Sequence, residues 1–267
     1  MIRIVRLKAR LGVALRSWPR TKRALRTLWD WCSPISSPTK ILTARLRGLE
    51  RIYFVQIGSN DGMSGDPLRP LIEHDSRFTG IFVEPQPDAF KRLVSLYRGT
   101  GRDLHFENAA VAEKDGQRKL YFVDPAAAGQ FPDLAGWSER VASLSYQHVV
   151  DHLGEAYRHL VVSMNVKCVS YRTLLATHCL PRVDLLHIDA EGHDAAILRT
   201  IDFDHCPPRV ILFESSHMDW RAKRDIYAFL ADNGYRLLPV DLDTLAERDD
   251  RCPNNKLRWI ANEAARL

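Results

Sequence analysis

Two glycines and a carboxylate have the types and spacing that a nucleoside-binding site requires. Gly58 and Gly62 lie in the stretch FVQIGSNDG, directly after a short apolar run, and Glu84 follows 22 residues after Gly62. Glycine lets the backbone approach a ligand closely, and a carboxylate at the tip of the next strand can accept both hydroxyls of a ribose. The spacing therefore predicts recognition of a nucleoside.

The same loop argues against a dinucleotide. A pyrophosphate-binding loop usually reads Gly-x-Gly-x-x-Gly, but Asn60 stands at the third position of that pattern. Asp61 adds a negative charge where phosphates would lie. A cationic ligand fits this loop better than a diphosphate, so a nicotinamide-dependent oxidoreductase is the less favoured alternative.

The elements that must position these residues are short apolar runs that alternate with helical stretches. The runs are apolar at nearly every position, as strands buried on both faces of a parallel sheet are. We expect an α/β fold with a Rossmann-like, doubly wound, mostly parallel sheet. The predicted strands are 51–57, 80–85, 104–111, 183–189, 209–215 and 235–240, and the predicted helices are 67–75, 86–98, 192–200 and 219–233.

Polar residues follow five of these strands, where the ligand crevice of such a sheet lies. Any one of them is more often a helix cap or a turn residue. Five strand ends together predict a site. The residues are Gly58 to Gly62, Glu84 with Pro85, Asn108 with Ala109, Asp189 to Gly192, and Glu214 to His217.

Several stretches together resemble the FkbM family of class I methyltransferases, over roughly residues 52 to 262. They are FVQIGSNDG, FVEPQPDAF, ENAAVAEKDGQRKLYFVD, VKCVSYRTLL, VDLLHIDAEGHDAAIL and RVILFES. The resemblance implies the class I methyltransferase fold and S-adenosylmethionine as the cofactor. The residues that it assigns to the cofactor are Gln56, Gly58, Ser59, Asn60 and Asp61 at the methionine end, Glu84 and Pro85 at the ribose, Asn108 and Ala109 at the adenine edge, and Asp189. Two positions depart from the family pattern, because Gln56 stands where many members have Asp and His187 where Lys is usual.

The family implies O-methylation of a hydroxyl on a sugar, glycan or secondary metabolite, and such a transfer benefits from a base. The candidate catalytic residues are Asp189, Glu191 and His193, with Asp189 first as a site residue and His193 first as the base. His187 lies in the apolar run LLHI and is predicted to be a satisfied core side chain. A non-catalytic scaffold that binds a nucleoside or a membrane is the alternative from a different class.

No metal is assigned to the site. Oxygen ligands from Asp189 and Glu214 would suit Mg²⁺, but we treat a divalent metal as the less favoured alternative. His148 and His152 share a helical face without a His-Glu-x-x-His pattern, and we expect them on a solvated helix.

Residues 124–163 do not fit the sheet. This long segment is rich in small residues at its start and carries Trp137, Ser143, Ser145 and Tyr146. Long insertions in compact domains are usually functional or disordered. We interpret this one as a lid that also binds the acceptor, and the alternative is a pair of surface helices that merely covers the sheet.

Charge divides the 267 residues into a basic extension, 1–50, and a methyltransferase domain, 51–267. The extension has twelve Lys or Arg against two acidic residues, whereas the rest has 26 basic and 31 acidic residues. The domain therefore has no overall positive charge that would attract nucleic acid.

Residues 1–30 have the pattern of a basic amphipathic helix. Three interpretations of this helix stay open: contact with a membrane surface, packing on the body or a partner, and a transit peptide. Residues 33–40 are the predicted linker. Five scattered cysteines without a Cys-x-x-Cys pair favour a reducing, cytoplasmic location. The sequence does not reveal the oligomeric state.

Overall fold

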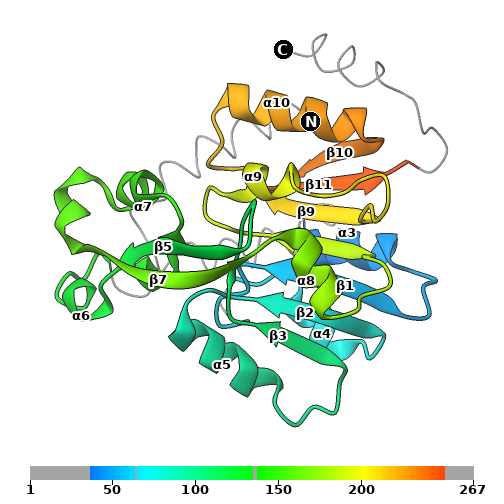
Figure 1. The fold of residues 1–267 in the computed structure, drawn as a ribbon, viewed down its shortest axis with the longest axis horizontal. Helices are drawn as coiled ribbons and strands as arrows, with labels where there is room; N and C mark the ends of the chain where they lie inside the picture. The colour runs from blue at the N-terminus through cyan, green and yellow to red at the C-terminus, as the bar shows by residue number, and fades with distance from the viewer. Residues whose placement is uncertain (1–36, 64, 135–136, 250–267) are drawn as a thin grey trace.

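A seven-stranded sheet forms the centre of the computed structural model, which describes residues 37–63, 65–134 and 137–249. Its strand order is β10-β11-β9-β8-β1-β2-β3 (Figure 1). The five strands from β9 to β3 pair in parallel, and β11 is antiparallel to both of its neighbours. The bounds are β1 Ile52–Ile57, β2 Phe78–Val83, β3 Leu104–Glu107, β8 Leu185–Ile188, β9 Val210–Glu214, β10 Tyr235–Val240 and β11 Asp243–Arg248. The predicted mostly parallel α/β sheet is confirmed.

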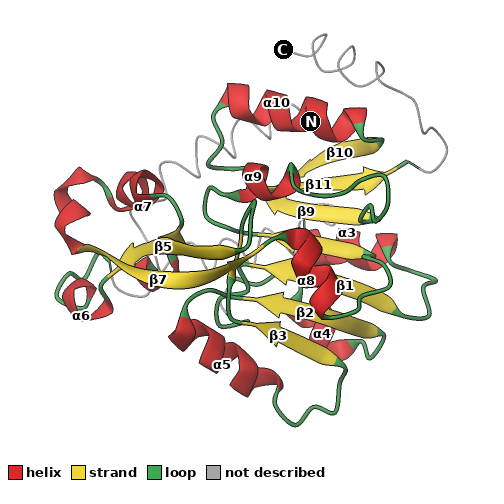
Figure 2. Ribbon diagram, in the orientation of Figure 1, coloured by secondary structure: helices red, strands yellow, loops and turns green. Residues whose placement is uncertain are grey.

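Helices cover both faces of this sheet, as a doubly wound fold requires (Figure 2). Successive side chains of a strand point to opposite faces, so Phe54 packs in one apolar cluster and Val55 in the other. The Phe54 cluster includes side chains from α3 Pro38–Arg45, α4 Arg69–His74 and α5 Pro87–Tyr97. The Val55 cluster includes side chains from α8 Tyr171–Thr177, α9 Asp194–Leu198 and α10 Trp220–Asp232.

A second, four-stranded sheet carries the insertion. Its order is β4-β7-β5-β6, with β4 Ala110–Val111, β5 Gly116–Val123, β6 Ala142–Ser143 and β7 Val161–Val169. The long strands β5 and β7 run antiparallel and extend away from the main sheet (Figure 1). Between them lie α6 Pro125–Ala128, the 3₁₀ helix η2 Ser138–Arg140, α7 Tyr146–Leu153 and the 3₁₀ helix η3 Glu155–Leu160. The single strand predicted at 104–111 is thus split between the two sheets as β3 and β4.

The packed body begins before residue 51. Helix α3 starts at Pro38, inside the predicted linker, and Leu42 and Leu46 are buried with Ile72 in the Phe54 cluster. Their apolar side chains need this cover, so residues 38–46 are structurally part of the body. The predicted basic helix at 1–30 lies outside the described residues. Within the ranges that the structure describes, there is no helix with both the length and the apolar character needed to cross a membrane.

Candidate active site

The carboxylate of Glu84 is held between two backbone amides at the carboxyl end of β2. The N–H of Asn60 donates to Oε2 at 2.8 Å, and the N–H of Gln86 donates to Oε1 at 2.8 Å. Each carboxylate oxygen can accept more than one hydrogen bond, so both oxygens keep capacity for a ligand. These two backbone amides therefore fix the orientation of Glu84, the residue predicted to bind the ribose.

Burial sets the charge of this carboxyl group. Glu84 is only 4% exposed, and this desolvation raises its pKa to about 7, although the amides of Gln86 and Asn60 oppose the shift. The side-chain amide of Asn108 donates to the backbone oxygen of Glu84 at 2.7 Å, which ties the end of β3 to the end of β2. A ligand that hydrogen-bonds the carboxylate would favour its ionised form.

Gly58 brings the ends of β1 and β8 into contact. Its φ is +76°, and a Cβ at this position would lie 1.8 Å from the backbone oxygen of Asp189. The N–H of Asp189 in turn donates to the oxygen of Ile57 at 3.0 Å. A side chain at position 58 would separate these strand ends, so the glycine is needed for close approach as well as for its φ.

A cavity of about 660 Å³ opens at these strand ends, within the size range of small-molecule sites. Most of the sequence-predicted site residues line it: Gln56, Gly58, Ser59, Asn60, Glu84, Pro85, Ala109, Asp189, Glu191 and His193. Asp61 and Asn108 do not. The Asp61 carboxylate accepts a hydrogen bond from the N–H of Met63 at 2.9 Å. The Asn108 side chain donates a hydrogen bond to the backbone oxygen of Glu84.

The two departures from the family pattern are neighbours. Gln56 on β1 and His187 on β8 are paired in register, and both are buried and line the cavity. Gln56 Oε1 and His187 Nδ1 have no hydrogen-bond partner. His187 is thus buried as predicted, but the expectation that it is satisfied is wrong. Burial lowers its pKa to about 4, so the imidazole is neutral.

Asp66 adds a carboxylate to the same wall, and sequence reasoning missed it. Its Oδ2 is buried without a partner, and burial raises its pKa to about 6. At neutral pH Asp66 therefore supplies a negative charge beside Gln56. No motif contains Asp66, and its place before Pro67 carries no signal for a binding site.

The three candidate catalytic side chains have different surroundings. Burial and then the nearby carboxylates of Glu214 and Glu191 raise the pKa of Asp189 well above its usual range. Burial lowers the pKa of His193, whose Nε2 lies 3.4 Å from Glu113 Oε2. Glu191 is directed toward the insertion, with its Oε2 3.3 Å from His148 Nε2.

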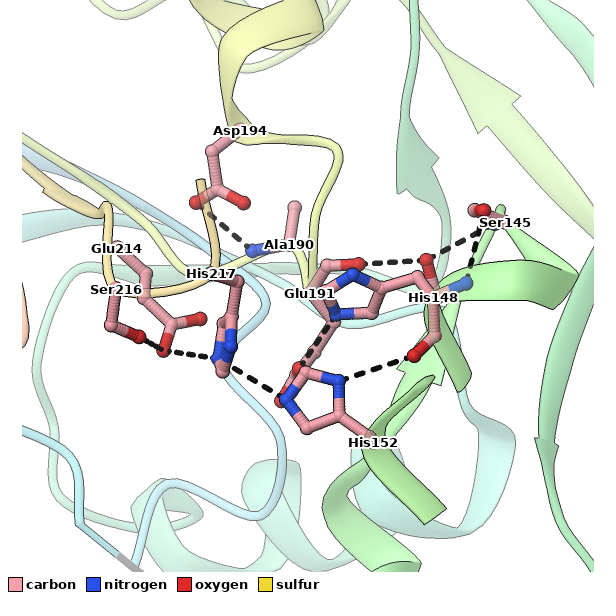
Figure 3. Close-up of polar contacts among 10 residues, drawn as sticks. Ser145, His148, His152, Ala190, Glu191, Asp194, Glu214, Ser216 and His217 are labelled. Atoms are coloured by element: carbon pink, nitrogen blue, oxygen red, sulfur yellow. Dashed lines mark hydrogen bonds and ion pairs between the residues drawn. The ribbon is translucent and has the colours of Figure 1, made fainter. Parts of the chain in front are cut away.

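The insertion forms a second wall of the cavity. Trp137, Arg140 and residues 141–144 line it, and the hydroxyl of Ser143 donates to the backbone oxygen of Glu191 at 2.7 Å. Arg140 was not predicted, because an exposed arginine in a 3₁₀ turn has no sequence pattern of its own. The expected solvated placement of His148 and His152 is wrong, since both are partly buried against the loop after β8 and the segment after β9 (Figure 3).

The parallel sheet, with a cavity and a hydrogen-bonded carboxylate at the carboxyl ends of its strands, has the architecture of a Rossmann-like fold. The chain matches the methyltransferase FkbM domain over residues 56–237. It belongs to this family, as predicted, and is a methyltransferase for which the family implies S-adenosylmethionine.

Solved structures of methyltransferases show weak similarity to this chain. One from Geobacter sulfurreducens has 11% identity and a TM-score of 0.42, covering 90% of this chain and 96% of its own. The precorrin-6Y C5,15-methyltransferase of Geobacter metallireducens has 10% identity and a TM-score of 0.38, with coverages of 79% and 87%. The ribosomal protein L11 methylase of Lactobacillus delbrueckii subsp. bulgaricus has 10% identity and a TM-score of 0.38, with 79% of each chain covered. These likenesses are too weak to support an argument. No curated protein matches the chain significantly.

Proposed function

We propose that this protein transfers the methyl group of S-adenosylmethionine to a hydroxyl oxygen on a sugar, glycan or secondary metabolite. The observation that carries the cofactor half of the proposal is Glu84, buried at the cavity with both oxygens oriented by backbone amides. Two ribose hydroxyls would donate to these oxygens, and each charge-assisted bond contributes about 1.5–3 kcal/mol.

The methionine end of the cofactor would lie along the loop from Gly58 toward Gln56. The partnerless Oε1 of Gln56 can accept from the cofactor ammonium, and Asp66 supplies the charge that Gln56 lacks. Ala109 lines the wall where the adenine edge would pack. The site thus offers acceptors and negative charge to a cationic nucleoside.

The chemical step requires in-line attack of the acceptor oxygen on the sulfonium methyl carbon. The new C–O bond forms as the C–S bond breaks, the electron pair stays on sulfur, and the hydroxyl proton passes to a base. Positioning supplies much of the rate. Asp189 with its raised pKa and His193, neutral because burial lowers its pKa, are the proposed bases, and Glu191 is the third candidate.

The insertion at 124–163 is the proposed lid and acceptor-binding element. Trp137 and Arg140 line the cavity and would contact an acceptor there. An aromatic face suits a sugar ring or another planar group, and exclusion of water would strengthen the electrostatic interactions inside.

The proposal is tested by incubating the full-length protein with labelled S-adenosylmethionine and a panel of hydroxylated glycans and metabolites. Mass spectrometry should find an acceptor that gains one labelled methyl group at oxygen. Asp189→Asn and His193→Ala, assayed at matched cofactor occupancy, should lower kcat. Cofactor binding without transfer to any acceptor in the panel would favour the non-catalytic scaffold, and transfer only to nitrogen would overturn O-methylation.

We further propose that the protein is cytoplasmic and has no nucleic-acid partner. We also propose that its residues 1–30 contact a membrane surface. Liposome flotation of the full chain beside a truncated chain beginning at residue 37 tests the contact. The truncation should start there because Leu42 and Leu46 are buried in the body. Equal flotation of the two chains would refute membrane contact.

A further inference from the structure

Five metal-ligating side chains from three separate segments meet beside the cavity. His148 and His152 come from α7, Glu191 from the loop between β8 and α9, and Glu214 and His217 from the end of β9 and the segment after it (Figure 3). We call these residues the His-Glu cluster. No sequence motif joins them, because only the fold brings the three segments together.

Two distances within the His-Glu cluster match those between ligands of one metal ion, whereas His217 Nε2 and Glu214 Oε1 form an ion pair at 2.7 Å that a bound ion would replace. His148 Nε2 lies 3.3 Å from Glu191 Oε2, and His152 Nε2 lies 3.3 Å from His217 Nε2. Ligand atoms about 2.0–2.1 Å from a tetrahedral zinc ion are separated by about 3.3–3.4 Å. Two overlapping triads, His148-His152-Glu191 and Glu191-Glu214-His217, each have their ligand atoms within 4.8 Å of one another.

Hydrogen bonds outside the cluster orient its ligands. His152 Nδ1 lies 3.2 Å from the backbone oxygen of His148, and a carbonyl only accepts, so Nδ1 carries the proton. The lone pair of a neutral His152 is then on Nε2, which faces His217. The hydroxyl of Ser216 donates to Glu214 Oε1 at 3.0 Å. Ligands of metal ions are commonly held by such backbone and hydroxyl partners.

The loop after β8 is shaped to admit the imidazole of His148. Gly192 has a φ of +86°, and a Cβ there would lie 2.3 Å from His148 Nδ1. The hydroxyl of Ser143 donates to the backbone oxygen of Glu191 and fixes the same loop to the insertion. A side chain at position 192 would overlap the His148 imidazole, so one of the two would have to shift.

We propose that the His-Glu cluster binds a single divalent transition-metal ion, with zinc(II) as the first choice. A ligand set of imidazole and carboxylate suits zinc, iron(II), nickel and copper, whereas nearly all protein ligands of Mg²⁺ and Ca²⁺ are oxygen atoms. The side chains are partly buried, with 14% of His148, 21% of Glu191, 14% of Glu214 and 29% of His217 exposed. The ion would thus be sheltered but reachable from solvent.

Such an ion would join the insertion to the main sheet at the edge of the cavity. Glu191 and Glu214 line the cavity, while His148 and His152 belong to α7 of the insertion. A role in holding the acceptor oxygen rests on the proposed methyl transfer, whereas metal binding itself is measured without cofactor or acceptor.

Zinc binding to the full-length protein, freed of metal with a chelator, tests the proposal. Competition with a chromophoric chelator and elemental analysis should give one zinc per chain. His152→Ala and His217→Ala should each weaken binding at least about tenfold. His159→Ala is the matched control, since His159 is an exposed histidine of the same insertion outside the cluster, and it should bind zinc like the wild type.

Cobalt(II) substitution separates the cluster from the cysteines. Absorption typical of nitrogen and oxygen ligands that is lost in the His152→Ala variant supports the site. Thiolate-to-cobalt charge transfer would overturn the proposed site, and so would equal zinc affinity in all three histidine variants. Failure of the wild-type protein to retain zinc would also overturn it and would show that the cluster is only a hydrogen-bonded network. Metal binding without any methyl transfer would contradict the proposed function and leave the metal site standing.

Discussion

The two walls of the cavity are held in place in different ways. The cofactor wall is made of strand ends in one sheet, and backbone amides fix the carboxylate of Glu84. The insertion wall is carried on β5 and β7 and is joined to the sheet by side-chain contacts such as Ser143 to Glu191 and His148 to Glu191. The first wall is therefore rigid in itself, whereas the second depends on contacts that a ligand, an acceptor or an ion can strengthen. Changes in the first wall should affect cofactor binding, and changes in the second should affect the acceptor.

Gly58→Ala should have the largest effect, because it damages the rigid wall itself. The added Cβ would overlap the Asp189 oxygen in addition to the strain of a φ of +76°. We expect the free energy of unfolding to fall by about 3 kcal/mol or more, with loss of cofactor binding. Gly99→Ala is the matched control, since Gly99 has a φ of +79° with nothing within 4 Å, and should cost only about 1 kcal/mol. Equal costs in chemical denaturation would show that the close approach is unimportant.

Glu84→Gln should have the second-largest effect, which is a loss of affinity for the cofactor. One charge-assisted bond to the ribose is worth about 1.5–3 kcal/mol, so titration calorimetry should find S-adenosylmethionine binding more than about tenfold weaker. Glu107→Gln is the control, because Glu107 ends β3 but pairs with Lys167 outside the cavity. An unchanged affinity in Glu84→Gln would remove the ribose assignment.

Cofactor affinity should also depend on pH through Glu84. Its folded-state pKa of about 7 lies above the ordinary value of 4.5, so the protonated form stabilises the free protein below about pH 4.5, and this contribution is lost as the pH rises through 7. Ribose hydroxyls favour the ionised form. Affinity should therefore rise as the pH approaches 7 and level off above it, with about a tenfold loss at pH 6. The same titration on Glu84→Gln should keep only the smaller loss near pH 6 that protonation of Asp66 causes. An equal pH dependence in both proteins would assign the effect to groups other than Glu84.

Arg140→Ala should have the smallest effect on the cofactor and a measurable one on the acceptor. The residue is exposed at the insertion wall, so we expect the Kd for S-adenosylmethionine to change less than about twofold, while the acceptor KM rises several-fold. Steady-state kinetics with the acceptor found in the panel measures both values. A parallel loss of cofactor and acceptor binding would erase the distinction between the two walls.

The difference between the walls also explains which features could be predicted from sequence. Gly58, Glu84 and Asp189 follow buried apolar strands, and the geometry of a parallel sheet brings such strand ends together. Strand β5 was missed because its exposed Gln117, Arg118 and Lys119 carry no buried-strand pattern. Asp66 and Arg140 were missed, and the meeting of the His-Glu cluster residues was not predicted, because these contacts arise only through tertiary packing.

The central claim is that this cavity is an S-adenosylmethionine site, and ligand-dependent thermal stability of the full-length protein tests it most directly. Each ligand is titrated separately against the same protein, with the Glu84→Gln variant in parallel. We expect S-adenosylmethionine to raise the Tm in a concentration-dependent way, more in the wild type than in the variant, and NAD to leave it unchanged. Stabilisation by NAD alone would contradict the account.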